Sequence, residues 1–494
     1  MEMKKRKLRL YFTSDVHGYC FPTDYISQGA LPLGLFQCSV DFRKDENTLI
    51  IDGGDYLQGS ALNQYCWRVQ GDFKVLAEML NVCEYDYVAL GNHDFNFGQK
   101  TLYDYLDGLN ATPLCENLQD CQGEVLFPHK IHTLRNGLRV GLVGMVTDFV
   151  KIWEKPENIE GMHFVDPIES ARKALNQLRD KVDITMGIYH GGFERDLESN
   201  RLLSDTRENV ACEICEELDF DILLTGHQHM TITGQYYSDT YIIQPPQQGQ
   251  GYAYLELEKK GERLEISSEI RQPQSPFKLN PALGQFAHLE AKLQEWLDVI
   301  VGELPEPLSV GERVEMALKG SPLADLFNRL QLIYSGAEIS ATSLANDAKG
   351  LPRTIRRRDL FAAYPYANTF VVLEITGEKL RGAVERSASY LSINEEGELE
   401  VDHTFLKPKV EHYNYDFYAG IEKEIDYNYP MGSRVQSLKY KGVEVKGEDQ
   451  FTICINDYRA SGAGGYGMYP KCKVIKEVRV EMIEMLLDYF SNKV

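Results

Sequence analysis

The sequence predicts a two-domain protein of mixed α/β class (α+β), and three observations support this prediction. The chain has 494 residues, more than a single hydrophobic core normally organises. Its first half alternates short apolar runs with helix-like stretches, which is typical of layered α/β domains. Its composition then changes at RQPQSPFKLN (271–280). We therefore expect a first domain over 1–270, a linker with a bridging helix over 271–303 and a second domain over 304–494.

The predicted elements follow in chain order. Six apolar runs indicate the strands of the first domain: LRLYF (8–12), TLIID (48–52), YDYVAL (85–90), LRVGLVGMV (138–146), ITMGIYH (184–190) and FDILLTG (220–226). Stretches such as DFKVLAEML and PIESARKALNQLRD between them have helical spacing, and YAYLELE (252–258) is a last strand. LGQFAHLEAKLQEWLDVIVG predicts the bridging helix. In the second domain, NTFVVLEI and FTICI predict strands and LRGAVERSASYL predicts a helix.

Charge, hydropathy and cysteine usage exclude several classes of protein. A net charge of −22 argues against binding a nucleic-acid polymer. No apolar run approaches the roughly 20 residues of a membrane helix. The N-terminal MEMKKRKLRLYF lacks the apolar segment of a secretory signal, so we expect a cytoplasmic protein. The cysteines show no paired spacing, and the CxxC of Cys212 and Cys215 fits buried helical thiols better than a metal or redox site. The sequence does not indicate an oligomeric state.

Polar clusters directly follow five of the predicted strands. They are SDVHG (14–18), DGGD (52–55), GNHD (91–94), YHGG (189–192) and TGHQH (225–229). Because functional groups in α/β folds collect at the carboxyl ends of strands, these clusters are expected to converge on one pocket. Each is weak evidence alone, but the ordered series is unlike a set of chance turns.

The residue types in these clusters predict a site for two metal ions. Oxygen and imidazole donors without cysteine suit Mn²⁺, Fe, Zn²⁺ or Co²⁺. The donors exceed the need of one tetrahedral ion and are sufficient for two ions that share a bridging carboxylate: Asp15, His17, Asp55, Asn92, His190, His227 and His229. Such ions would supply the local positive charge that a phosphate substrate needs in an acidic protein.

The series D-x-H, GGD, GNHD, H-G-G, GHxH closely resembles the calcineurin-like metallophosphoesterase superfamily. The resemblance implies an α-β-β-α sandwich and hydrolysis of a phosphoester. It also implies that Asp55 bridges the two ions and that His93 stabilises the transition state or the leaving group. The remaining ligands divide between the ions as Asp15, His17 and His229 for one and Asn92, His190 and His227 for the other.

The second domain resembles the C-terminal domain of the 5′-nucleotidase family, an α/β domain that grips the nucleoside. The resemblance rests on 340–370, 411–435 and 455–470 and implies a small-molecule nucleotide whose base stacks between two aromatic side chains. Tyr458 is the first candidate, and its partner is Tyr413 or Tyr415, with Tyr413 preferred. The arginines of PRTIRRRD (352–359) either hold a phosphate or begin a surface helix.

Three departures from the usual 5′-nucleotidase pattern indicate a related group. Asn96 stands where those enzymes have an aspartate beside the catalytic histidine, SLAND (343–347) replaces Gly-Gly-x-Arg, and Gly464 replaces an aspartate. NHxFNxG, YNYDF and NxYRASGxGG instead resemble 2′,3′-cyclic-nucleotide 2′-phosphodiesterase/3′-nucleotidases. We therefore predict hydrolysis of cyclic nucleotides to 3′-nucleotides and then to nucleosides, with His93 and Asn96 as catalytic residues. The alternatives are a 5′-nucleotidase or nucleotide-sugar hydrolase, and a silent nucleotide-binding protein.

Overall fold

The computed structural model describes residues 6–27, 29–203, 207–274, 281–366, 368–407, 410–478 and 480–491. The chain divides into two compact units, Met1–Gln294 and Glu295–Val494. The helix α8 (Ala282–Leu297) crosses that division. The separate linker expected over 271–303 stays a prediction, and its residues 275–280 lie outside the described part.

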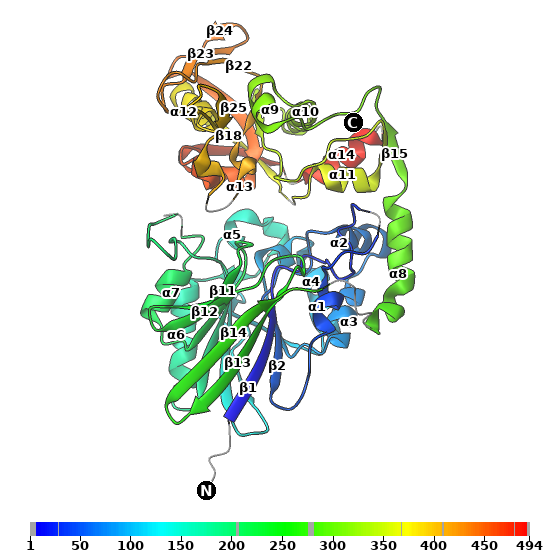
Figure 1. The fold of residues 1–494 in the computed structure, drawn as a ribbon, viewed down its shortest axis with the longest axis vertical. Helices are drawn as coiled ribbons and strands as arrows, with labels where there is room; N and C mark the ends of the chain where they lie inside the picture. The colour runs from blue at the N-terminus through cyan, green and yellow to red at the C-terminus, as the bar shows by residue number, and fades with distance from the viewer. Residues whose placement is uncertain are drawn as a thin grey trace. The chain divides into compact units, whose positions relative to one another are not determined.

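The first unit is built on two β-sheets (Figure 1). One has the order β14-β13-β1-β2-β3-β4-β5, with β8 beside β4. Its strands are β14 (Arg263–Arg271), β13 (Tyr252–Lys260), β1 (Arg6–Thr13), β2 (Thr48–Asp52), β3 (Tyr87–Ala89), β4 (Thr112–Gln119), β5 (Val125–Phe127) and β8 (His163–Phe164). The other has the order β11-β12-β10-β9-β7-β6 and the strands β11 (Ile232–Tyr237), β12 (Thr240–Gln244), β10 (Ile222–Thr225), β9 (Ile184–His190), β7 (Arg139–Val146) and β6 (Lys130–Thr133).

A hydrophobic core joins the two sheets, because alternate side chains of each strand point inward. In β1 these are Leu8, Leu10 and Phe12, and they belong to the same buried cluster as Ile184 and Met186 of β9. A two-residue side-chain period places every second residue on one face, so the eight residues of β1 give three apolar side chains to this layer.

Helices cover the outer faces of both sheets and complete the sandwich. The helices α6 (Pro167–Leu178) and α7 (Ala211–Glu217) pack on the outer face of β7, β9 and β10. On the other side lie α1 (Leu35–Ser39), α3 (Lys74–Val82) and α4 (Gly98–Gly108) (Figure 1). This confirms the predicted α-β-β-α sandwich.

The predicted helical cysteines lie in α7. Cys212 and Cys215 are buried, and burial raises the pKa of the Cys212 thiol to about 11 and of the Cys215 thiol to about 12. Thiols that stay protonated at neutral pH are poor nucleophiles and poor metal ligands. The CxxC is therefore part of the core.

The second unit centres on a mixed sheet of order β21-β16-β25-β18-β26. These strands are β21 (Phe417–Ala419), β16 (Ile339–Thr342), β25 (Gln450–Asn456), β18 (Phe370–Thr376) and β26 (Lys473–Val478). One buried cluster joins Phe370 and Val372 of β18 to α10 (Pro322–Ser335), α11 (Arg357–Ala363) and α14 (Met482–Phe490). A second joins Leu373 and Ile375 to α12 (Gly377–Ala388). Helices thus cover both faces, which confirms the predicted α/β domain.

The remaining elements of the second unit are short. The helices α9 (Arg313–Lys319) and α13 (Asp457–Ala460) and three small strand groups frame the sheet. The groups pair β15 (Ile300–Glu303) with β17 (Thr354–Arg356), β19 (Leu391–Ile393) with β20 (Leu399–Val401), and β23 (Val435–Tyr440) with β22 (Glu422–Ile425) and β24 (Val443–Glu444). In the described part of the chain, no helix combines the length and apolar character that crossing a bilayer requires.

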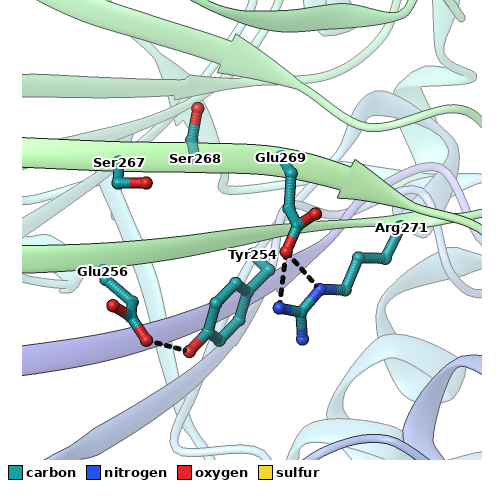
Figure 2. A pocket seen from close by; sticks show the side chains of 6 residues that line it. All are labelled: Tyr254, Glu256, Ser267, Ser268, Glu269 and Arg271. Carbon is teal, nitrogen blue, oxygen red and sulfur yellow. Dashed lines mark hydrogen bonds and ion pairs between the residues drawn. The ribbon is translucent and has the colours of Figure 1, made fainter.

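A polar depression of about 350 Å³ lies on the hairpin of β13 and β14 (Figure 2). The Tyr254 hydroxyl donates to Glu256 at 2.7 Å, and the Arg271 guanidinium donates to Glu269 and lies 3.7 Å from the Tyr254 ring centroid. These side chains satisfy one another, and none comes from the five polar clusters.

Candidate metal centre and base-binding residues

The topology gathers all five polar clusters of the first unit at matching strand ends. The strands β1, β2 and β3 run parallel, so the segments that follow them leave one sheet at the same edge. The strands β9 and β10 are parallel in the other sheet. Because the sheets pack face to face, their carboxyl ends bring all seven predicted ligands onto neighbouring loops.

Five of the seven predicted ligands have a left-handed backbone. The φ angles are 55° for Asp15, 51° for His17, 58° for Asp55, 70° for His227 and 52° for His229. Non-glycine residues rarely adopt this region, and each such residue costs about 1–3 kcal/mol where it is strained. The fold therefore holds the ligand loops in conformations that the local sequence would not choose.

Asp15, His17 and His229 form the first ligand group. Their candidate ligand atoms all lie within 4.8 Å of one another. The Nε2 atoms of His17 and His229 are 3.0 Å apart, and His229 Nε2 lies 3.4 Å from Asp15 Oδ1. This is the trio that the family resemblance assigned to one ion.

Asp55, His190 and His227 form the second ligand group. Asp55 Oδ2 lies 3.0 Å from His190 Nε2 and 3.9 Å from His17 Nε2, between the two groups. Three buried atoms here, Asp55 Oδ2, Asn92 Oδ1 and His190 Nε2, lack a well-aligned hydrogen-bond partner among the described residues. Buried polar atoms are rarely left unpaired. A carboxylate oxygen, an amide oxygen and an imidazole nitrogen gathered in this way fit a divalent cation.

The electrostatics of the site also fit cation binding. Burial opposes ionisation of Asp15 and Asp55, yet His229 and His190 hold the pKa of Asp15 below its usual value, and His190 and His93 hold that of Asp55 well below. Burial lowers the pKa of His17 to about 4, which leaves its imidazole neutral. Burial opposes charge on His190 as well, but the two aspartates raise its pKa to about 10. The buried carboxylates thus demand positive charge, which a metal ion would supply.

Hydrogen bonds behind three ligand histidines select the nitrogen that faces the site. His17 Nδ1 and His190 Nδ1 each lie 2.7 Å from a backbone carbonyl, those of Gln58 and Gly53. A carbonyl only accepts, so these Nδ1 atoms carry the proton and Nε2 is available to an ion. His227 Nε2 instead lies 3.0 Å from Glu208 Oε1. Sequence reasoning missed Glu208, because no local motif marks a carboxylate that reaches a histidine nineteen residues away.

Asp94 ties the second and third polar clusters together and is not a ligand. Its carboxylate accepts the backbone N–H groups of Gly91, Asp55, Tyr56 and Leu57 at 2.8–3.0 Å. It thereby places Asp55 and Asn92 next to each other.

His93 lies beside the ligand groups with Asn96 behind it. Its ring centroid is 5.6 Å from that of His17, and its backbone N–H donates to Asp55 Oδ1 at 2.8 Å. His93 Nδ1 and Asn96 Oδ1 are 2.7 Å apart. The structure thus brings together the two residues predicted to be catalytic.

The second unit places Tyr413 and Tyr458 side by side. Their ring centroids are 6.4 Å apart with the planes at 69°, and Tyr458 is 40% exposed. Tyr415 is buried, and its hydroxyl donates to the carbonyl of Ala317 at 2.9 Å, so it belongs to the core. The geometry favours Tyr413 as the partner of Tyr458, although the two rings are not parallel.

A buried arginine couples the loops that carry the two tyrosines. Arg459 forms a 2.9 Å ion pair with Asp416, and its guanidinium donates to the carbonyls of Tyr413 and Ala463. Two of the arginines of PRTIRRRD make contacts with the start of the second unit: Arg358 is buried against Asp298, and Arg357 donates to the carbonyl of Trp296. Arg358 and Arg357 thus pack within the second unit.

The fold and the site together define a metallophosphoesterase with two candidate metal-binding groups. Residues 8–231 match the family described as calcineurin-like phosphoesterase, and residues 300–471 match the 5′-nucleotidase, C-terminal domain. The chain belongs to the 5′-nucleotidase family of calcineurin-like metallophosphoesterases, which are hydrolases of phosphoric esters.

Similar proteins cover almost the whole chain. A Staphylococcus aureus structure, described as a candidate 5′-nucleotidase in complex with alpha-ketoglutarate, is 34% identical, with a TM-score of 0.87 over 98% of this chain and 97% of that one. The trifunctional nucleotide phosphoesterase YfkN of Bacillus subtilis is 23% identical over 98% of this chain, which spans 38% of YfkN's length. A 2′,3′-cyclic-nucleotide 2′-phosphodiesterase/3′-nucleotidase of Salmonella typhimurium is 23% identical over 92% of this chain and 81% of its own.

Proposed function

We propose that the protein hydrolyses 2′,3′-cyclic nucleotides to 3′-nucleotides and then to nucleosides. The observation that carries this choice is the pairing of His93 with the amide of Asn96 at 2.7 Å, where a 5′-nucleotidase is expected to have a carboxylate. Relatives named for this two-step activity support it.

Asp15, His17 and His229 would hold one divalent ion, and Asn92, His190 and His227 the other, with Asp55 between them. Bound ions of this kind lower the pKa of a shared water and neutralise phosphoryl oxygens. The identity of the metals stays open among Mn²⁺, Zn²⁺, Fe and Co²⁺. His93, held by Asn96, then has the position to stabilise charge on the phosphoryl or leaving oxygen.

Tyr413 and Tyr458 would bind the base. Stacking on an aromatic side chain contributes about 1–3 kcal/mol per base and tolerates different bases. Because the two planes now meet at 69°, at least one ring must rotate to admit a base between them. The half-exposed Tyr458 is the freer of the two to do so.

A substrate panel tests the proposal. The protein is purified, loaded with Mn²⁺ and assayed for products from 2′,3′-cyclic AMP, 3′-AMP and 5′-AMP. We expect turnover of the first two to dominate, with His190→Ala inactive because it removes a ligand. Dominant turnover of 5′-AMP would establish the second candidate, a 5′-nucleotidase or nucleotide-sugar hydrolase, which the Staphylococcus aureus relative favours.

The same assay addresses a silent nucleotide-binding protein. Such a protein would release no phosphate when loaded with metal. It would also still bind nucleotide after His190→Ala. A cytoplasmic location also remains our proposal, which fractionation of the source cells would test.

A further inference from the structure

We propose that Glu154 is a positioning residue for His93 and acts through Asn96. The inference deepens the proposed function, since it takes His93 as the group that faces the substrate. The relevant residues lie in one hydrogen-bonded chain: His93 Nδ1 is 2.7 Å from Asn96 Oδ1, and Asn96 Nδ2 is 2.6 Å from Glu154 Oε2.

Glu154 is buried at the end of the short helix α5 (Val150–Trp153) and is fully hydrogen bonded. Its Oε1 accepts the backbone N–H of Lys155 at 2.7 Å and the side-chain amide of Asn158 at 2.8 Å. Asn158 also donates to the carbonyl of Asn96 at 2.9 Å. Burying a carboxylate is costly unless its oxygens are bonded, and here three N–H donors hold it in one orientation.

The chemistry of the three groups fixes the direction of each hydrogen bond. Both oxygens of the Glu154 carboxylate accept from N–H donors, so Asn96 turns its NH₂ toward Glu154 and its oxygen toward His93. That oxygen can only accept, so His93 Nδ1 must carry a proton. Glu154 therefore selects the tautomer of His93 through the side chain of Asn96, as carboxylates do for metal-bound histidines.

A glutamine at position 154 would remove this directionality. The glutamine oxygen would stay toward the N–H donors of Lys155 and Asn158, so its NH₂ would face Asn96, which would then rotate and present its own NH₂ to His93 Nδ1. That arrangement favours the other tautomer and places the proton on Nε2. The size and the hydrogen-bonding capacity of the side chain would otherwise be nearly unchanged.

The neighbouring residue shows that this segment supports the site in a second way. Trp153 stacks on His227, with ring centroids 5.7 Å apart and planes at 23°. Substitution of Glu154 therefore needs a control that reports on the local fold.

The first test compares Glu154→Gln with wild type on 3′-AMP and on p-nitrophenyl phosphate. The nucleoside oxygen is a poor leaving group that needs help from His93, whereas p-nitrophenolate leaves readily. We expect kcat for 3′-AMP to fall roughly 10- to 100-fold, with little change in KM and a much smaller loss on p-nitrophenyl phosphate.

The matched control is Glu160→Gln. Glu160 is an exposed carboxylate in the same region, so this variant should have the kinetics of wild type. Equal losses on both substrates in Glu154→Gln would overturn the proposal.

A second variant separates positioning from a structural role. Asn96→Asp combined with Glu154→Gln places a carboxylate directly beside His93 and should recover most of the lost kcat. A residue that only held α5 in place could not be replaced in this way, so failure of the rescue counts against the proposal.

A spectroscopic readout keeps the inference testable whatever the substrate. The full chain is labelled with ¹⁵N-histidine and loaded with Zn²⁺, and the His93 resonance is assigned with His93→Asn. We expect a protonated Nδ1 in wild type and a shift toward protonated Nε2 in Glu154→Gln. Unchanged nitrogen shifts would overturn the positioning role. A wild type that shows the expected shifts but hydrolyses no nucleotide would support it while refuting the proposed function.

Discussion

At the scale of single residues, burial separates the candidate base-stacking tyrosines. Tyr413, Tyr415 and Tyr458 look alike in sequence, but Tyr415 is 3% exposed and Tyr458 is 40% exposed. The Tyr415 hydroxyl is bound to Ala317, so its ring packs in the core of the second unit. Tyr413 and Tyr458 are therefore the pair that we propose for base stacking.

The first prediction separates these roles by substitution. Tyr458→Ala should raise KM for nucleotides roughly 5- to 150-fold, because about 1–3 kcal/mol of stacking is lost. KM for p-nitrophenyl phosphate should hardly change, since this substrate has no base. Steady-state kinetics on both substrates would measure the difference. Tyr415→Phe is the control, which should lower stability by about 1 kcal/mol and leave both KM values unchanged. Equal rises in the two KM values for Tyr458→Ala would exclude the base-stacking role.

At the scale of elements, the site depends on how closely the loops after β2 and β3 approach. A side chain on Gly91 would place its Cβ 2.2 Å from Asp55 Oδ1 and 2.4 Å from the Asp55 nitrogen, and one on Gly54 would meet the Gly91 nitrogen at 2.3 Å. Asp94, in the loop after β3, ties the two loops together by accepting the backbone N–H groups of Asp55, Tyr56 and Leu57. Glycine is needed at positions 54 and 91 because a Cβ atom at either would overlap the backbone of the opposite loop or the Asp55 carboxylate.

The second prediction concerns Gly91→Ala. The added methyl group cannot fit without moving Asp55, so Mn²⁺ affinity should fall roughly 10- to 100-fold, as when other supports of a metal site are lost. Titration calorimetry of the metal-free protein would measure it. Gly284→Ala, on α8 with open space around the added carbon, should bind Mn²⁺ like wild type. Wild-type affinity in Gly91→Ala would show that the loops can separate without loss of the site.

At the scale of the whole molecule, the candidate metal groups lie in one unit and the candidate base-binding tyrosines in the other. Each unit has its own buried clusters of apolar side chains. Units with separate cores can unfold separately. Metal binding should then stabilise the first unit alone, because a ligand stabilises only the folded state that it binds.

The third prediction is that calorimetry of the Mn²⁺-loaded protein shows two unfolding transitions and that EDTA lowers only one. A metal present at a hundred times its Kd contributes about 2.7 kcal/mol, so that transition should fall by roughly 5–10 °C. Asp55→Asn should make it insensitive to EDTA. Phe327→Ala, in the core of the second unit, should lower only the other transition. If EDTA shifted both transitions equally, the units would be unfolding as one.

The sequence by itself determined the fold class, the five strand-end clusters and the nature of the donors. Alternating apolar residues specify strands locally, and short motifs such as GNHD place their donors within a few residues of a strand end. The resemblance to known families added the expectation that Asp55 is the shared ligand and that Asn96 is the partner of His93.

Only the tertiary structure decided which side chains hydrogen bond to the site residues and orient them. Glu154 reaches Asn96 across 58 residues, and Glu208 reaches His227 across nineteen, so no local pattern records either contact. The choice between Tyr413 and Tyr415 likewise depended on packing against Ala317, 98 residues away. Hydrogen bonds and burial between distant segments arise when the chain folds, and they set the orientation that the chemistry of the site requires.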